Sequence, residues 1–206
     1  MKKIWDISPP VDAQSAVFPG DTSYSQRLHF AISPSCPVQV HAITLSPHTG
    51  AHADAPMHYA PGGEAVGALD LHPFIGPCRV IHCLDSGPLV QPHHIAHALD
   101  HLPPRVLIRT SQNASQSWAS FTALAPASIA LLATLNVALI GIDTPSVDPS
   151  DSQTLQAHQA LHRLKLRVLE NLVLDDVPEA DYELIALPLK LIHADASPVR
   201  AILRTL

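Results

Sequence analysis

The sequence predicts a single α/β domain over residues 1–206, with a mixed β-sheet or barrel-like core and flanking helices. Its 206 residues are 47% hydrophobic and 15% charged, which suits one domain with a sizeable core. Short apolar runs rich in valine and isoleucine recur along the chain, and stretches with helical spacing separate several of them. Strands that alternate with helices are typical of an α/β fold.

The predicted strands are short apolar runs bounded by turn residues. The first 80 residues contain no convincing helix, so we expect them to be rich in strands and loops. Many of the 20 prolines lie in connections between runs, which predicts stiff loops. In chain order, the expected strands cover residues 38–45, 80–84, 106–108, 137–142, 172–174, 184–187 and 199–203.

Three segments between the later runs have helical spacing. Proline stands at the start of the first two, where its fixed φ and its missing N–H are tolerated. The third begins in a polar run that offers side chains for N-terminal capping. The expected helices cover residues 92–102, 126–136 and 152–166.

Composition and charge exclude several classes of function. The 12 Lys and Arg residues are outnumbered by 18 Asp and Glu residues, and the net charge of −6 would repel a phosphate backbone. We therefore expect no nucleic-acid partner. No apolar run approaches the roughly 20 residues that span a bilayer, and the N-terminal residues lack the apolar segment of a secretory signal. These features predict a cytoplasmic protein without a membrane partner. Three cysteines without a CxxC spacing are expected to be free thiols: Cys36, Cys78 and Cys83.

The strongest chemical signal lies at residues 48–58, which read His-Thr-Gly-Ala-His-Ala-Asp-Ala-Pro-Met-His. Three histidines and one aspartate stand at even offsets, so an extended or gently bent chain would present all four on one side. A helix would place His52 and Asp54 about 200° apart. The pattern therefore predicts a non-helical segment that directs its ligands to one point: His48, His52, Asp54 and His58.

The residue types in this segment indicate a metal site. Imidazole and carboxylate ligands suit zinc, manganese or iron(II), and the absence of thiolates favours a catalytic site. Asp54 has two carboxylate oxygens and could bridge two ions. Further ligands are available downstream at Glu170 and at either His158 or His162, which the spacing does not distinguish. On one straight helix His158 and Glu170 would be roughly 18 Å apart, so a turn must separate them.

Residues 48–58 resemble the motif His-x-Gly-Thr-His-x-Asp-x-Pro-x-His of the bacterial kynurenine formamidases, metal-dependent members of the cyclase-like hydrolase family. Ala51 replaces the threonine of that motif, and every ligand position is retained. The resemblance implies a cyclase-like fold, a homodimer, and hydrolysis of N-formyl-L-kynurenine to L-kynurenine and formate in tryptophan degradation. It extends along nearly the whole chain, through residues 4–8, 18–21, 141–148, 181–189 and 195–200.

The resemblance also implies two divalent ions per subunit, as zinc or manganese. The first ion would be held by the start of the motif, and the second would share Asp54 with two downstream side chains. The implied ligands are His48, His52 and Asp54 for one ion, and Asp54, His158 and Glu170 for the other. The choice of His158 over His162 thus comes from the resemblance.

The implied mechanism uses a metal-activated hydroxide that attacks the formyl carbon. His58 would be the acid/base that protonates the leaving aniline nitrogen. Phe18 would contact the aromatic substrate at a position where the formamidases commonly have tryptophan, whose indole N–H it lacks. By contrast, Trp5 and Trp118 are expected to be packing residues.

Two alternative functions remain. The first is a related cyclic-amide hydrolase for a substrate such as isatin, which would use the same metal ligands and differ in the pocket around Phe18. The second is a non-catalytic metal-binding protein, because His93, His97 and His101 would share one face of the predicted helix 92–102. For these three histidines we prefer a solvent-facing role.

Overall fold

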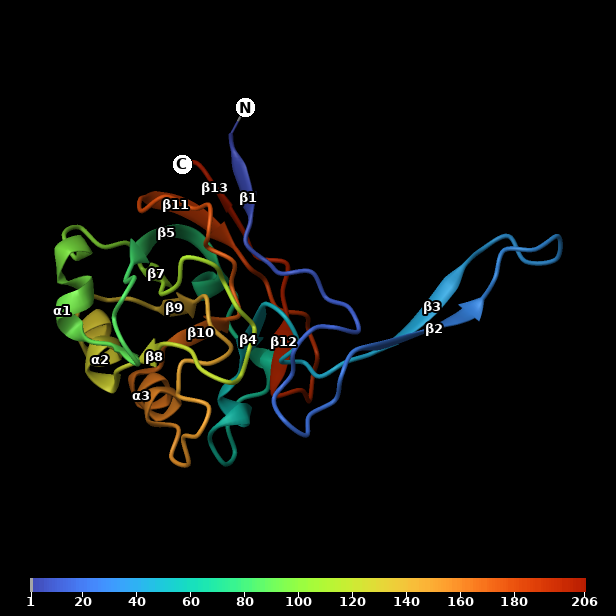
Figure 1. The fold of residues 1–206 in the computed structure, drawn as a ribbon, viewed down its shortest axis with the longest axis horizontal. Coiled ribbons are helices and arrows are strands. Elements are labelled where there is room, and N and C mark those ends of the chain that lie inside the picture. Colours follow the sequence, from blue (N-terminus) through green and yellow to red (C-terminus); the bar gives the residue numbers. More distant parts are fainter. Residues whose placement is uncertain (1) are drawn as a thin grey trace.

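The computed structural model describes residues 2–206 (Figure 1). The strands are β1 (Ile4–Asp6), β2 (Ser25–Phe30), β3 (Val40–Thr44), β4 (His52–Asp54), β5 (Ile75–His82), β6 (Leu89–Val90), β7 (Arg105–Arg109), β8 (Ala123–Leu124), β9 (Leu139–Ile142), β10 (Arg167–Glu170), β11 (Asp181–Ile185), β12 (Ala196–Pro198) and β13 (Ile202–Arg204). The α-helices are α1 (Pro92–Ile95), α2 (Pro126–Thr134) and α3 (Gln156–Leu164). Short 3-10 helices are η1 (Pro56–His58), η2 (Val66–Ala68), η3 (His72–Phe74) and η4 (Ala96–Ala98).

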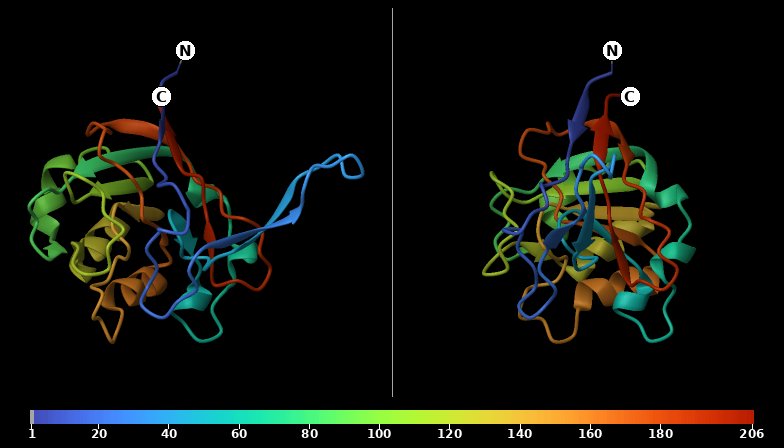
Figure 2. Two further views of the ribbon diagram at one scale, coloured as in Figure 1. Left: turned by 45° about the vertical axis from the view of Figure 1, so that its right-hand side comes forward. Right: turned by 90° about the vertical axis from the view of Figure 1, so that its right-hand side faces the viewer.

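Nine strands form one mixed sheet in the order β1-β13-β11-β5-β7-β9-β10-β4-β12. The central strands β5, β7, β9 and β10 pair in parallel, whereas the strands on either side pair antiparallel. The sheet curls into an open half-barrel (Figure 2). The predicted α/β class with a mixed, barrel-like sheet is therefore confirmed.

The two faces of the sheet carry separate hydrophobic cores. In β7, Val106 and Ile108 face one core, which also includes Ile129 of α2 and Leu161 of α3. Leu107, between them, belongs to the core on the other face. This alternation follows from the two-residue period of a strand, and it places the helices on one side of the sheet (Figure 1). No helix within residues 2–206 is both long and apolar enough to span a bilayer.

Most predicted elements are confirmed, with ends that shift by a few residues. β3, β7 and β9 coincide with apolar runs, and β5, β11 and β13 overlap theirs. Helices α2 and α3 lie inside the segments that had helical spacing. As expected, no α-helix occurs in the described part of the first 80 residues.

The predicted strand at residues 172–174 is wrong. Leu172 and Leu174 are buried in the core, but they lie in a loop, and their apolar character reflects packing alone. The strand is β10, which starts earlier because Lys165 takes a left-handed φ of 60° and ends α3. Both end residues of β10, Arg167 and Glu170, are charged, so the apolar run within this strand is only Val168 and Leu169.

The predicted helix at residues 92–102 is also largely wrong, because only α1 and the short η4 form. His101 takes a left-handed φ of 48°, and Leu102 precedes two consecutive prolines, so a helix cannot continue to residue 102. His97 instead lies with Nε2 at 2.8 Å from Glu179 Oε1. The shared histidine face on which the metal-binding alternative depended is therefore not formed.

Candidate metal centre

Strand β4 carries the centre of the histidine motif. Its register places His52 opposite Glu170 and Asp54 opposite Val168 on β10. Ala53 points into the core on the other face of the sheet, so His52 and Asp54 share the face that the helices cover. The predicted convergence of even-numbered side chains arises here from an ordinary strand.

The rest of the motif comes from turns. His48 lies in the turn before β4, and His58 ends the 3-10 helix η1. The ring centroid of His48 lies 5.1 Å from that of His52 and 4.2 Å from that of His58. All four motif side chains therefore gather at one place, although only two of them belong to an extended strand.

Helix α3 adds His158, which is buried at 2% exposure. Its Nε2 lies 3.2 Å from Asp54 Oδ2 and 3.4 Å from Glu170 Oε1. His162, one turn later, lines a different surface groove beside Arg163 and Lys165. The turn between α3 and β10 brings His158 and Glu170 together, as the sequence required.

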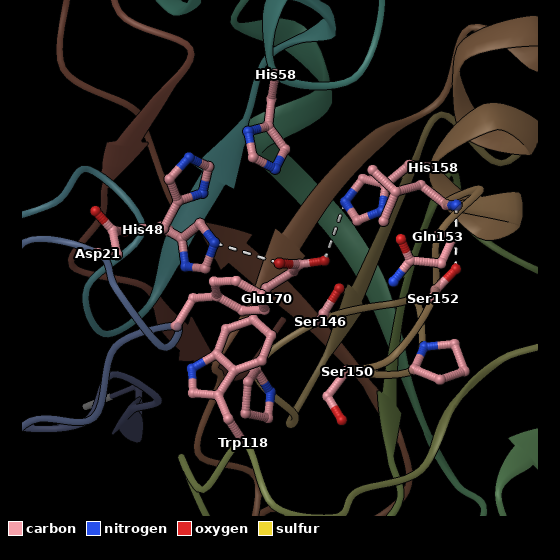
Figure 3. A pocket seen from close by; sticks show the side chains of 15 residues that line it. Asp21, His48, His58, Trp118, Ser146, Ser150, Ser152, Gln153, His158 and Glu170 are labelled. Carbon is pink, nitrogen blue, oxygen red and sulfur yellow. Dashed lines mark hydrogen bonds and ion pairs between the residues drawn. The ribbon is translucent and has the colours of Figure 1, made fainter.

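The predicted ligands lie close together around one point, and Figure 3 shows two of them, His158 and Glu170, directed toward each other. His52 Nε2 lies 3.4 Å from Asp54 Oδ1 and 3.3 Å from Glu170 Oε2. His48 Nδ1 lies 3.1 Å from Asp54 Oδ1. Within residues 2–206, two overlapping groups have ligand atoms within 4.8 Å of one another: His48, Asp54 and His58, and His52, Asp54 and Glu170.

A second layer of hydrogen bonds orients these ligands. His52 donates from Nδ1 to Gly50 O at 2.8 Å, and His158 donates from Nδ1 to Asp148 Oδ2 at 2.8 Å. Glu170 Oε1 accepts a hydrogen bond from the backbone N–H of Val147 at 2.8 Å. Both imidazoles therefore turn Nε2 toward the carboxylates, an arrangement that metal-ligating histidines commonly have.

The electrostatics show how strongly these groups depend on one another. Burial raises the pKa of Asp54, but the close imidazoles of His158 and His48 outweigh burial and hold it well below its ordinary value. Burial lowers the pKa of His158, yet hydrogen bonds to Asp148, Asp54 and Glu170 keep it well above its ordinary value. The same balance, with two carboxylates as partners, raises the pKa of His48 to about 10.

A bound cation fits this arrangement. Asp54 Oδ1 is buried and accepts no hydrogen bond of standard geometry, although two imidazole nitrogens face it. Buried carboxylate oxygens are normally paired, so an unpaired one among nitrogen ligands is suited to a metal ion. The mixed nitrogen and oxygen donor set accepts zinc and manganese.

A cavity of about 320 Å³ opens onto this cluster. Phe18 and Trp118 form an edge-to-face pair on its wall, with ring centroids 5.0 Å apart. The cavity is large enough for a small aromatic ligand. Phe18 thus lies on the cavity wall, and Trp118, which we expected to be a packing residue, packs against it on the same wall.

The structure adds Asp195, which sequence analysis missed. Its Oδ2 lies 3.0 Å from His48 Nε2 and 3.2 Å from His58 Nδ1. Strand β12 pairs with β4, and this pairing brings Asp195 beside the motif. No local spacing could reveal it, because 137 residues separate Asp195 from His58.

Comparisons with known proteins agree with this geometry. A family model described as putative cyclase matches residues 5–149. A kynurenine formamidase from Polaromonas naphthalenivorans (strain CJ2) is 76% identical over 204 residues, which cover 99% of this chain and 92% of that protein. A predicted metal-dependent hydrolase from Bacillus stearothermophilus has a similar structure, with a TM-score of 0.85, 25% identity and coverage of 100% of both chains. Isatin hydrolase A from Labrenzia aggregata has a TM-score of 0.84 and 26% identity, over 99% of this chain and 94% of its own. The chain therefore belongs to the cyclase family and, within it, to the kynurenine formamidase group.

Proposed function

We propose that this protein is an arylformamidase that hydrolyses N-formyl-L-kynurenine to L-kynurenine and formate in tryptophan degradation. The observation that carries the proposal is a buried cluster of histidine and carboxylate ligands at the base of a cavity with an aromatic wall. The 76% identical kynurenine formamidase supports it over nearly the full chain. We also propose that residues 1–206 act as one hydrolase domain, since β1 and β13 from the two ends pair within one sheet.

We propose two zinc ions per subunit, with manganese as the other option. The first would be held by His48, His52 and Asp54, and the second by Asp54, His158 and Glu170. The unpaired Asp54 Oδ1 and the close approach of all these side chains support this assignment. A divalent ion at this site would supply Lewis acidity, which lowers the pKa of a water molecule and stabilises negative charge on the formyl oxygen.

The side chains around the ligands complete the reaction. Phe18 and Trp118 hold the benzoyl ring, so that the formamide points toward the ligand cluster. His58 protonates the aniline nitrogen as the C–N bond breaks, because this nitrogen leaves poorly as an anion. The oxygen of water bonds to the formyl carbon and departs with formate. Asp195 keeps a proton on Nδ1 of His58, which leaves Nε2 to exchange a proton with the substrate.

The experiment that tests this function compares N-formyl-L-kynurenine with isatin as substrates of the purified, metal-loaded protein. We expect rapid turnover of the formamide and little of isatin, because the formamidase relative is far more similar than the isatin hydrolase. His58→Ala should retain its metal and lose about 100-fold or more in kcat. His162→Ala is the matched control, since His162 lies outside the cavity. Preferential turnover of isatin, or full activity of His58→Ala, would contradict the proposal.

We further propose a homodimer built around the β2–β3 hairpin. This hairpin projects from the body of the protein (Figures 1 and 2), and every residue of β2 is exposed. A two-stranded hairpin is marginally stable in water by itself, and large exposed apolar patches usually mark interfaces. A second copy of the chain would cover the apolar side chains Leu28, Phe30, Ile32, Val38, Val40 and Ile43.

The proposed dimer is tested by measuring the molar mass of the protein by light scattering as it elutes from a size-exclusion column. We expect twice the chain mass for the wild type and a monomer for the double variant Leu28→Asp with Ile43→Asp, because two charges on this hairpin would oppose burial. A wild-type monomer would contradict the proposal. We also place the protein in the cytoplasm, and the three free cysteines support a reducing compartment.

A further inference from the structure

A tight turn places an aromatic ring and a carboxylate together at the mouth of the cavity. Asp21 donates its backbone N–H to Phe18 O at 2.9 Å, which closes a four-residue turn. Pro19 and Gly20 occupy the central positions, and Gly20 has a φ of 93°. A Cβ on Gly20 would have open space around it, so glycine is favoured here by the positive φ alone. The turn therefore holds the backbones of Phe18 and Asp21 close together.

Asp21 is distinctive among the side chains that line this cavity. Within residues 2–206, the other acidic residue on the lining is Glu170, which belongs to the ligand cluster, and no lysine or arginine lines the cavity. Asp21 is exposed at the rim, and its Oδ1 accepts a hydrogen bond from the N–H of Thr22. Its Oδ2 has no hydrogen-bond partner in the described residues 2–206, so it is available to a ligand.

The opposite side of the cavity has a different chemistry. Ser150, Ser152 and Gln153 contribute hydroxyl and amide groups without charge. Figure 3 shows Asp21 beside His48 on one side, and these three neutral side chains on the other. A ligand that carries both an aromatic ring and a positive charge would thus find a ring wall next to a carboxylate that lies outside the ligand cluster.

We propose that Asp21 binds the α-ammonium group of the substrate and so selects aryl formamides that carry an amino-acid side chain. This inference rests on the proposed function and extends it to the end of the substrate that does not react. The aromatic pair holds the ring, while Asp21 accepts a charge-assisted hydrogen bond from the ammonium. Binding energy from this remote group then helps to place the formamide at the ligand cluster.

The test uses the metal-loaded protein and two substrates that differ in one part. N-formyl-L-kynurenine carries the amino acid, and 2-formamidoacetophenone has the same ring, ketone and formamide without it. The readout is the ratio of kcat/KM for the two substrates in the wild type, in Asp21→Asn and in Asp151→Asn. Asp151 is an exposed aspartate outside the cavity lining, so its variant controls for the change in net charge.

We expect the ratio to fall about tenfold in Asp21→Asn and to stay unchanged in Asp151→Asn, because only Asp21 would lose a charged hydrogen bond to the substrate. Inhibition by L-kynurenine should weaken about tenfold in the same variant, whereas inhibition by 2-aminoacetophenone should not. An unchanged ratio in Asp21→Asn, or an equal fall in both variants, would overturn the proposal. Wild-type protein that hydrolyses neither formamide would overturn the proposed function itself.

Discussion

Replacing Asp195 by asparagine separates orientation of the acid/base from metal binding. Asp195 Oδ2 is close to Nδ1 of His58 and to Nε2 of His48, so one oxygen serves both histidines. Asparagine has nearly the same shape but carries no charge. It would weaken the preference of His58 for a proton on Nδ1, and a part of the population would then present the wrong tautomer to the substrate.

The size of this effect follows from the exposure of the pair. A hydrogen bond to a charged group is worth about 1.5–3 kcal/mol when well shielded from water. The side chains of His58 and Asp195 are 33% and 40% exposed, so solvent screens part of that interaction. We therefore expect about 1–2 kcal/mol, which corresponds to a fall in kcat of about fivefold to thirtyfold.

The assay is a double-mutant cycle on formamide hydrolysis at saturating zinc. If Asp195 acts through His58, then Asp195→Asn should have almost no further effect once His58 is alanine. Bound metal is measured in every variant, because Asp195 also contacts His48. Independent, multiplicative losses in the double variant would refute a role through His58. Loss of metal from Asp195→Asn would assign its effect to His48 instead.

The remaining predictions concern pH, packing and metal retention. In the ion-free protein, two carboxylates outweigh burial and raise the pKa of His48 from 6.5 to about 10. The raised pKa of His48 gives stability that is complete below pH 6.5 and is lost as the pH rises to about 10. The Tm of chelated protein should therefore fall between these two pH values, and a Tm that rises there would be contrary evidence. In Gly141→Ala, the new Cβ would meet buried methyl groups of Leu107 and Leu172 at 2.5 and 2.8 Å. The free energy of unfolding in urea should therefore fall by about 1–3 kcal/mol, and an unchanged value would show that the core adjusts freely. Asp54→Asn should lose both bound metal and activity, and full metal content by elemental analysis would argue against Asp54 as the shared ligand.

The motif at residues 48–58 was predictable because its information is local. Strand periodicity is two, so His52 and Asp54 share a face whatever the rest of the chain does. The need for a turn between His158 and Glu170 was likewise a matter of helix rise, and Lys165 provides it with a left-handed φ. The resemblance to a known family, and no spacing rule, selected His158 over its neighbour His162.

The parts that sequence analysis missed depend on contacts between distant segments. Asp195 reaches the motif only because β12 pairs with β4, which places Ala196 opposite Asp54. Trp118 lies in a loop, and its ring meets Phe18 from an equally irregular segment. Single-sequence periodicity describes local structure, so neither contact leaves a pattern that it could detect. The expected strand at residues 172–174 lies too late in the chain for the same reason, because β10 is fixed by its pairing with β9 and β4, which are far away in the sequence.

The central claim is that the histidine and carboxylate cluster holds the divalent ions on which formamide hydrolysis depends. The most direct measurement follows N-formyl-L-kynurenine turnover and metal content together, before exhaustive chelation, after it, and after zinc or manganese is restored. The account predicts that activity disappears with the metal and returns in proportion to the metal bound. Activity that persists in protein shown to be free of metal would contradict the claim.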